Sequence, residues 1–262
     1  MIDVEETITW QGDAVSCDGC EQRELLKSGG CQLKHACVND RYAKRIDRFF
    51  KQNPVLAKDY LAHPYFEVRA VAAKYTDLFH LQGLLHDPDE TVRWSAAQRL
   101  PQRCLLLMRA DPDREVRIRV AARLDESYLG SMINDPDYYV RQVVARRIDT
   151  GMLVLMMRDP DREVRMTVVK RIGDEWLAGM VRDEDADVRI VVASRIGTQH
   201  LPLLLDDRDW RVCYAVAGRI DSGFLLRLLK DPEDEVRERA QERLNKLAGA
   251  NVVVMHREKW HG

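Results

Sequence analysis

Hydrophobic and polar positions recur along most of this chain with a constant period of 24 residues. Seven periods begin with an aspartate, and a valine follows five residues after each start. The starts are Asp87, Asp111, Asp135, Asp159, Asp183, Asp207 and Asp231, with His63 at the same position one period earlier. No insertion breaks the spacing, so the pattern predicts an array of equivalent structural repeats.

The first half of each period predicts an α-helix. In the period that starts at Asp87, we expect this aspartate to cap the helix N-terminus. Pro88 then takes the first helical position, where its missing N–H costs nothing. Val92, Ala96 and Leu100 recur at i, i+4 and i+8 and therefore form one apolar face.

The second half of each period predicts a shorter helix. It carries aliphatic residues at i, i+3 and i+4, such as Leu153, Met156 and Met157. There is room for at most two turns before the next repeat starts, which favours 3₁₀ geometry. One unit cannot bury its own apolar face, so the units must stack. We therefore predict an all-α solenoid of about eight 24-residue units over residues 63–246.

Two rows of arginine accompany the repeats. The first follows the valine in seven of eight units, with Cys213 at the remaining position. Arg93 projects into the apolar arc of its helix, so we expect this row to be partly buried and to fork onto an aspartate of a neighbouring unit. The alternative is a row that binds an anionic partner.

The second row lies at the polar edge of each helix. It consists of Arg99, Arg123, Arg147, Arg171, Arg195, Arg219 and Arg243. Ion pairing or packing of the side-chain stems would explain it. A continuous basic stripe, which could recognise an acidic protein or nucleic acid, is the alternative.

The segments that flank the repeats differ in composition. Residues 39–62 predict a basic amphipathic helix, a break at Asn53-Pro54 and a short helix, which together form a linker or cap. The cations of this segment could instead form a docking face; they are Arg41, Lys44, Arg45, Arg48 and Lys51. Residues 247–262 are expected to be a C-terminal tail, with residues 251–255 extended.

Residues 1–38 contain the only pattern that indicates metal chemistry. Cys17, Cys20, Cys31 and Cys37 have the spacing C-x2-C-x10-C-x5-C. Four thiolates suit a [4Fe–4S] cluster or a structural Zn²⁺. The wide second pair is unusual for a zinc ribbon, but on the residues alone iron–sulfur, zinc, and disulfides or free thiols all stay open.

Composition narrows the function classes. The formal net charge of −2, with 32% charged residues, argues against a protein that coats nucleic acid. The acidic start has no signal-like apolar segment and no run is long enough to span a membrane, so we expect a cytoplasmic protein with reduced cysteines. No phosphate-binding loop or Ser/His/Asp pattern is apparent, and we expect a scaffold that binds an unidentified protein partner rather than an enzyme.

The unit DPDxxVRxxVAxRLxxxxLxxMxxD resembles the leucine-rich repeat variant (LRV) family. Four cysteines ahead of such repeats resemble the LRV iron–sulfur protein associated with nitrogen-fixation genes. The resemblance implies one α-helix and one 3₁₀ helix per repeat in a right-handed superhelix. It also implies an N-terminal [4Fe–4S] cluster held by Cys17, Cys20, Cys31 and Cys37. The chain departs from the pattern at Cys213 and at the starts 183–184 and 207–208.

This resemblance leads to one expectation about function and two alternatives. We expect an iron–sulfur protein whose repeats bind another protein, with a role in redox sensing or electron transfer. The first alternative is a non-redox scaffold in which the cluster or Zn²⁺ is structural. The second is nucleic-acid binding through an arginine row, which the net charge disfavours.

Overall fold

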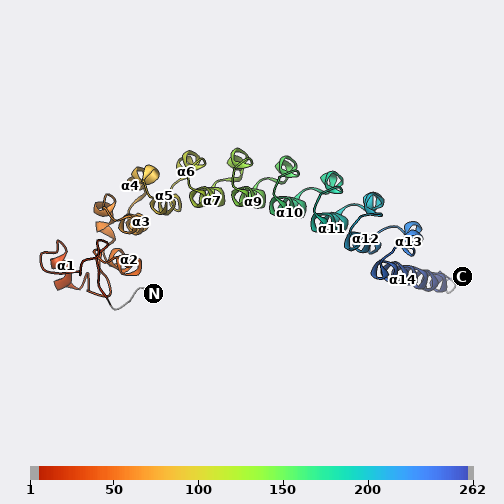
Figure 1. Cartoon of the computed structure of the whole chain (residues 1–262), viewed down its shortest axis with the longest axis horizontal. Coiled ribbons are helices and arrows are strands. Elements are labelled where there is room, and N and C mark those ends of the chain that lie inside the picture. The colour runs from red at the N-terminus through yellow and green to blue at the C-terminus, as the bar shows by residue number, and fades with distance from the viewer. Residues whose placement is uncertain (1–5, 259–262) are drawn as a thin grey trace. The chain divides into compact units, whose positions relative to one another are not determined.

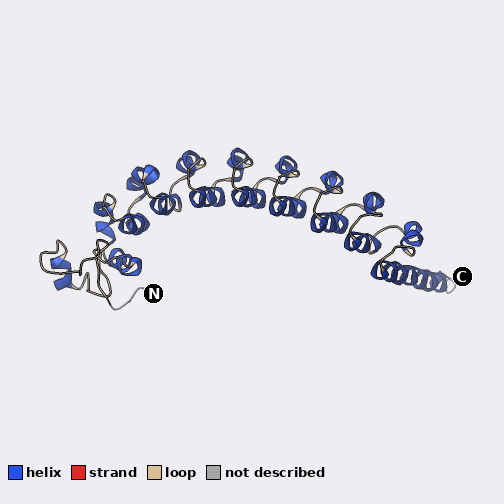
Figure 2. Ribbon diagram, viewed as in Figure 1, coloured by secondary structure: helices blue, strands red, loops and turns tan. Residues whose placement is uncertain are grey.

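The computed structural model describes residues 6–258, and the side chains up to residue 248. Within that range there is no β-strand, only two isolated bridges, and the prediction of an all-α repeat fold is confirmed (Figure 2). The chain divides into two compact units, Met1–Met132 and Ile133–Gly262, which we describe separately.

Unit 1 contains the cysteine-rich segment and the first repeats (Figure 1). Its longer helices lie in one row and its short helices in another. In chain order the elements are α1 (Arg23–Ser28), α2 (Ala43–Gln52), η1 (Pro54–Tyr60), α3 (Phe66–Tyr75), α4 (Leu78–Leu81), η2 (Gln82–His86), α5 (Glu90–Ala97), α6 (Gln102–Met108), α7 (Arg114–Arg123), α8 (Glu126–Leu129) and η3 (Gly130–Met132), where η marks a 3₁₀ helix.

Unit 2 repeats the same alternation of long and short helices. Its elements are α9 (Tyr138–Arg147), η4 (Thr150–Met156), α10 (Arg162–Arg171), η5 (Asp174–Met180), α11 (Ala186–Arg195), η6 (Thr198–Leu204), α12 (Trp210–Ala217), α13 (Ser222–Leu228) and α14 (Asp234–Glu258). The predicted 3₁₀ geometry is confirmed in η4, η5 and η6. It is wrong for α6 and α13, which are α-helical, because over seven residues the two hydrogen-bond patterns differ little in energy.

The core of each unit lies between its two rows of helices. Val92, Ala96 and Leu100 are fully buried, as the periodicity predicted, and Leu105 of the following short helix is buried as well. The expected helix, break and short helix are present, since α2 ends at Gln52 and η1 begins at Pro54. The short helices thus close the apolar face that each long helix presents.

The first arginine row forms the predicted ladder. The Arg93 guanidinium donates from Nε and Nη2 to the two carboxylate oxygens of Asp111, at 2.8 and 2.9 Å. Its Nη1 donates to the backbone carbonyl of Asp87, at 2.9 Å. The pairs Arg69–Asp87, Arg141–Asp159, Arg165–Asp183 and Arg189–Asp207 repeat this fork. Each fork joins one repeat to the next.

The predicted helix cap is wrong by two residues. Asp89, not Asp87, caps α5, because its carboxylate accepts from the backbone N–H of Thr91 at 2.9 Å. Asp87 accepts from the N–H of Asp89 and from the Arg69 guanidinium instead. In the motif Asp-Pro-Asp, the first aspartate therefore binds the arginine of the preceding repeat, and the second aspartate caps the helix.

The second arginine row binds backbone carbonyls. Arg195 donates to the carbonyls of Val169 and Ile172, at 2.6 and 2.7 Å, which are acceptors left free at the end of α10. Arg99, Arg123, Arg171, Arg219 and Arg243 make equivalent contacts. The hypothesis of a free basic stripe is wrong for these six residues, because their guanidinium groups close the helix ends of the preceding repeats.

Cys213 interrupts the ladder in unit 2. Its thiol is buried and donates to the carbonyl oxygens of Leu205 and Asp207, at 3.5 and 3.4 Å. Burial, together with the negative charge of Asp231, raises the pKa of the Cys213 thiol to about 11. In the other forks the aspartate lies 18 residues after the arginine, as Asp207 does after Arg189. An arginine at position 213 would therefore meet the carboxylate of Asp231.

We expect Cys213→Arg to stabilise the protein by about 0.5–2 kcal/mol, because it supplies the missing fork to Asp231. The measurement is the urea midpoint of unfolding followed by circular dichroism. Cys213→Lys is the matched control, since lysine adds the charge without the bidentate geometry. An arginine variant no more stable than the lysine variant would contradict the ladder as a stabilising device.

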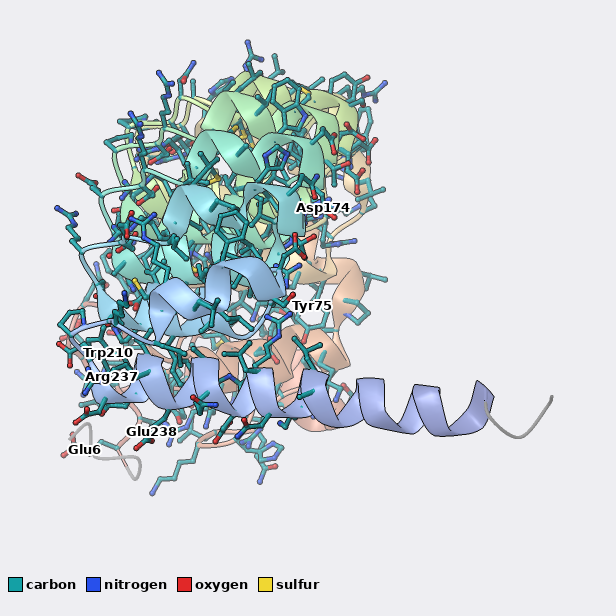
Figure 3. The ribbon with its side chains drawn as sticks, turned by 90° about the vertical axis from the view of Figure 1, so that its right-hand side faces the viewer. Glu6, Tyr75, Asp174, Trp210, Arg237 and Glu238 are labelled. Atoms are coloured by element: carbon teal, nitrogen blue, oxygen red, sulfur yellow. The ribbon has the colours of Figure 1, made fainter. Side chains whose placement is uncertain are left out.

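The last helix is longer than the repeat predicts. α14 runs from Asp234 to Glu258, past the expected boundary at residue 246, and Arg237 and Glu238 lie in its first turns (Figure 3). The expectation that residues 251–255 are extended is wrong, because a helix satisfies its own backbone hydrogen bonds whereas a lone extended segment does not. Residues 259–262 of the predicted tail lie outside the described residues.

Among the helices in the described part of the chain, none combines the length and the apolarity that a membrane span requires.

Candidate metal centre

Cys17, Cys20, Cys31 and Cys37 line one cavity in unit 1. Apolar side chains form much of the rest of its wall; they are Val15, Leu26, Leu33, Ala36, Val38 and Phe49. His35, the other metal-binding residue type in this stretch, is exposed and is not part of the wall. The structure therefore gathers the four predicted ligands, which span 21 residues of sequence, around a common space.

A tight turn presents the first two cysteines. The backbone N–H of Cys20 reaches the carbonyl of Cys17 at 3.4 Å, and Gly19 between them has a φ of +76°. This left-handed conformation is favourable only for glycine. The backbone N–H of Gln22 then donates to the Cys20 sulfur at 3.4 Å. The turn thus aims both thiols at one side and gives one of them an N–H donor.

The helix α1 carries the chain to the third cysteine. It ends at Gly29, whose φ of +79° is the left-handed helix cap, and the N–H of Gly30 returns to the carbonyl of Leu25 at 2.7 Å. This reversal places the Cys31 sulfur 3.8 Å from the carbonyl oxygen of Gln22. Cys31 also packs against the core cluster below the site.

A hairpin turn closes the wide gap between Cys31 and Cys37. Gln32 and Ala36 exchange both backbone hydrogen bonds at 2.8 Å, and Lys34 at the tip has a φ of +63°. In this antiparallel register the residues that flank the pair, Cys31 and Cys37, stand opposite each other. The hairpin therefore brings Cys31 and Cys37 together as a pair, although five residues separate them in the sequence.

The fourth cysteine lies over a buried ion pair. The N–H of Cys37 donates to the carbonyl of Arg45 at 3.1 Å, and the Arg45 guanidinium contacts the Asp40 carboxylate at 2.7 Å. The side chains of Arg45 and Asp40 are 4% and 0% exposed, so Arg45 does not belong to the predicted docking face. The nearby backbone N–H groups of Asn39 and Asp40 lower the pKa of the Cys37 thiol and so offset part of the effect of its burial.

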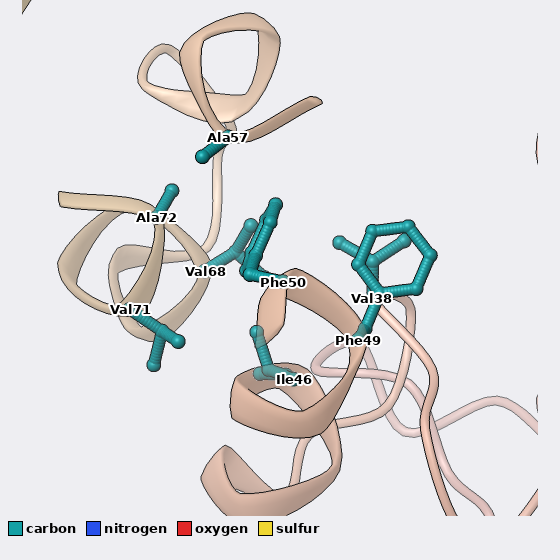
Figure 4. Packing of buried hydrophobic residues seen from close by; sticks show 8 residues of the cluster. All are labelled: Val38, Ile46, Phe49, Phe50, Ala57, Val68, Val71 and Ala72. Carbon is teal, nitrogen blue, oxygen red and sulfur yellow. The ribbon is translucent and has the colours of Figure 1, made fainter. Parts of the chain in front are cut away.

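A compact core connects this site to the first helices. Figure 4 shows Val38, next to Cys37, packed beside Phe49, near Ile46 and Phe50 of α2. The Asn53 amide donates to the carbonyls of Gly30 and Phe49, at 2.6 and 2.8 Å. The Gln22 amide likewise donates to the Tyr60 hydroxyl at 2.9 Å. The cysteine loops are thus fastened to the end of α2 and to η1.

The site disfavours bare thiolates. Burial raises the pKa of Cys37 to about 11, and the charges of Asp40 and Cys20 add to this effect. Burial also raises the pKa of Cys31, with further contributions from Cys20 and Cys17. A positive group beside Cys31 and Cys37 would offset these effects, and a metal centre supplies one while it releases the thiol protons. The donor set thus fits a group bound by four thiolates.

The cysteines do not form a closed ligand shell. Across residues 6–258, no three His, Cys, Asp or Glu side chains stand close enough together to hold a metal ion as they are placed. The assignment of Cys17, Cys20, Cys31 and Cys37 as ligands accordingly stays a prediction, supported by the cavity that they share.

Comparison with known proteins supports both the iron–sulfur assignment of the cysteine-rich segment and the repeat fold of the rest of the chain. A family model described as "LRV protein FeS4 cluster" matches residues 7–59. A solved leucine-rich repeat variant structure is 43% identical in sequence, with a TM-score of 0.81 over 87% of this chain and 98% of that one. The chain belongs to the LRV family. It is an iron–sulfur protein with a repeat solenoid.

A further relative of this LRV protein comes from Rhodobacter capsulatus. It is described as an uncharacterized 27.7 kDa protein in the nifB 3' region, and it is 51% identical over 96 residues. The match covers 37% of the LRV chain and 39% of that relative, so the chain spans well under half of the relative's length.

Two residues that contact the sulfurs escaped the sequence analysis. Gln22 follows Cys20 by two positions, and Asn39 follows Cys37 by two positions. The backbone N–H of Gln22 and the side-chain amide of Asn39 both donate to the Cys20 sulfur. A backbone N–H leaves no trace in the sequence, and only the amide side chain of Asn39, close to a cysteine of the motif, could have been noticed.

Proposed function

We propose that this LRV protein is an electron-transfer or redox-sensing protein whose repeats, together with the cap segment that contains α2, bind a protein partner. When bound, a [4Fe–4S] cluster accepts and releases one electron. The observation that supports this role is the pair of N–H donors at the Cys20 sulfur, from the Gln22 backbone and the Asn39 side chain, since such hydrogen bonds stabilise the extra negative charge of a reduced cluster. The partner, a redox protein, supplies or receives that electron.

We favour a [4Fe–4S] cluster over Zn²⁺ on the same grounds. The ligands come from a turn, a helix end and a hairpin, and such irregular loops suit a cluster larger than a single ion. Zinc ribbons instead use two close cysteine pairs. Visible absorbance of the purified protein separates the two occupants, because the zinc protein is colourless.

A scaffold fits the rest of the molecule better than an enzyme does. Two hollows beside the repeat starts of unit 2 are lined by Arg141, Asp159, Arg165 and Asp183. These side chains already bond to one another in the ladder. The ion pairs of the ladder explain why these charged side chains lie together in a buried place, so we assign them no catalytic role.

The partner's docking face, in this proposal, is the exposed side of α2. Lys44, Arg48 and Lys51 are exposed, and at about 100° per residue they fall within an arc of about 60°. Arg48 also donates to the carbonyl of His35, at 3.4 Å, in the hairpin between Cys31 and Cys37. Positive charge beside the cluster site suits an acidic redox protein, whose approach it would accelerate.

The decisive experiment for the redox role is a potentiometric titration of anaerobically purified protein, followed by electron paramagnetic resonance. We expect a reversible signal from the reduced cluster at a physiological potential. A cluster that is present but cannot be reduced or oxidised at an accessible potential would contradict the redox role and favour the non-redox scaffold.

The same preparation tests the docking face. We expect Lys44→Glu with Arg48→Glu to slow reduction by an acidic flavodoxin about tenfold at low salt, because electrostatic steering is lost. Reduction by a small neutral reductant should not change. Arg146→Glu with Lys170→Glu, two exposed cations of unit 2, is the matched control. Equal slowing in both double variants would remove α2 as the docking face, and binding of DNA to α2 would point to a nucleic-acid partner.

A further inference from the structure

Asn39 links the two halves of the cysteine motif. Its side-chain amide donates from Nδ2 to the Cys20 sulfur at 3.5 Å, and the residue itself follows Cys37 by two positions. Cys20 and Cys37 belong to the two separate halves of the cysteine motif. Asn39 therefore bridges the C-x2-C turn and the hairpin, and it also lines the cavity.

The neighbours of Asn39 hold it in place. Val38 is 2% exposed and packs in the core, and Asp40 is 1% exposed. The Asp40 carboxylate is fixed by the Arg45 guanidinium at 2.7 Å and by the backbone N–H of Tyr42 at 2.9 Å. With both flanking residues anchored, the Asn39 amide has little freedom to leave the Cys20 sulfur.

A donor at this position has a defined electronic effect. An N–H that donates to a cysteine sulfur withdraws electron density from it and stabilises the more negative, reduced form of an iron–sulfur centre. Cys20 receives two such donors, from the Gln22 backbone at 3.4 Å and from the Asn39 side chain at 3.5 Å. Only the second can be removed by substitution without changing the backbone.

We propose that Asn39 is a positioning residue of the iron–sulfur centre, which fixes the Cys20 and Cys37 sulfurs relative to each other and raises the reduction potential of the bound group. The residue is not a ligand and acts through the two cysteines. The effect on potential rests on the proposed redox role, whereas the effect on the sulfurs requires only that the centre is occupied.

The test compares Asn39→Asp and Asn39→Ser with the wild-type protein. Aspartate has the same size but replaces the donor with a negative charge, and serine keeps a shorter donor. We expect Asn39→Asp to disfavour reduction at least tenfold in the equilibrium constant, and Asn39→Ser to lie between it and the wild type. Asn245→Asp, at an exposed position of α14, is the matched control and should leave the potential unchanged.

A second measurement keeps this test separate from that of the proposed function. Resonance Raman spectra of the resting protein report the iron–sulfur(cysteine) stretches without any redox step, and we expect them to shift in Asn39→Asp. If no couple is accessible, the redox role fails while these spectra still test Asn39. Should Asn39→Asp not retain the centre, Asn39→Ser carries both measurements. Variants that load fully and match the wild type in potential and spectrum would overturn the proposal.

Discussion

Replacing Cys31 with serine is expected to abolish the visible iron–sulfur absorbance and to loosen the fold around the cavity. Cys31 lies opposite Cys37 in the hairpin and packs against the core cluster, so its sulfur belongs both to the predicted ligand set and to the packing. Serine offers a hydroxyl that replaces a thiolate ligand poorly, and metal binding of this kind is coupled to folding. Iron content and visible absorbance measure the first effect, and urea unfolding followed by circular dichroism measures the second.

Cys104→Ser is the matched control for this substitution. Cys104 is buried in α6, far along the sequence from the predicted ligands, and does not line the cavity. We expect its variant to keep full iron content and to lose only the stability typical of a buried polar replacement, about 1–3 kcal/mol. A Cys31→Ser protein with wild-type iron content would refute the ligand assignment at that position.

Replacing Arg141 is expected to have a large effect on the stability of the repeats. Its guanidinium forks onto Asp159 at 2.7 and 2.9 Å, and the two side chains are 10% and 5% exposed. Arg141→Leu leaves a buried carboxylate without its cation, which typically costs about 3–5 kcal/mol. Arg141→Asp should cost more, because it places a second carboxylate beside the first. Urea unfolding followed by circular dichroism measures both.

Two further variants make this prediction specific. Arg146→Leu, at an exposed position of the same helix, should change stability by less than about 0.5 kcal/mol. Combining Arg141→Leu with Asp159→Asn should recover part of the loss, since the buried charge is removed with its partner. Small and equal losses for Arg141→Leu and Arg141→Asp would mean that the ladder is not a buried ion-pair system.

The repeat fold could be predicted from the sequence because the same pattern of apolar and charged positions recurs every 24 residues. Helical projection placed Arg93 inside the apolar arc, and the aspartates that recur in register with it predicted a fork onto an aspartate of a neighbouring unit, which is Asp111. Projection could not decide which aspartate of Asp-Pro-Asp caps the helix, since both are suitable caps. Nor could it show that Arg195 reaches helix-end carbonyls, because that contact joins residues 23 and 26 positions apart.

The metal centre was predictable only as a list of cysteines. Their spacing suggested four ligands, yet the pairing of Cys31 with Cys37 depends on a hairpin whose tip residue, Lys34, has a positive φ. No propensity favours lysine there. The contact between Asn39 and Cys20 joins residues 19 positions apart, and only the folded chain brings them together.

The two arginine rows also bear on how the length of such a chain can change over evolution. In unit 2, the repeat that starts at Asp159 offers Arg165 to Asp183 of its successor, and Arg171 to the helix end of its predecessor. Loss or duplication of one whole 24-residue module joins an arginine to an equivalent aspartate and leaves both bonds intact. A deletion of any other size misaligns both. Gene variants of this array should therefore differ by multiples of 72 nucleotides, counted as three per residue of the 24-residue period.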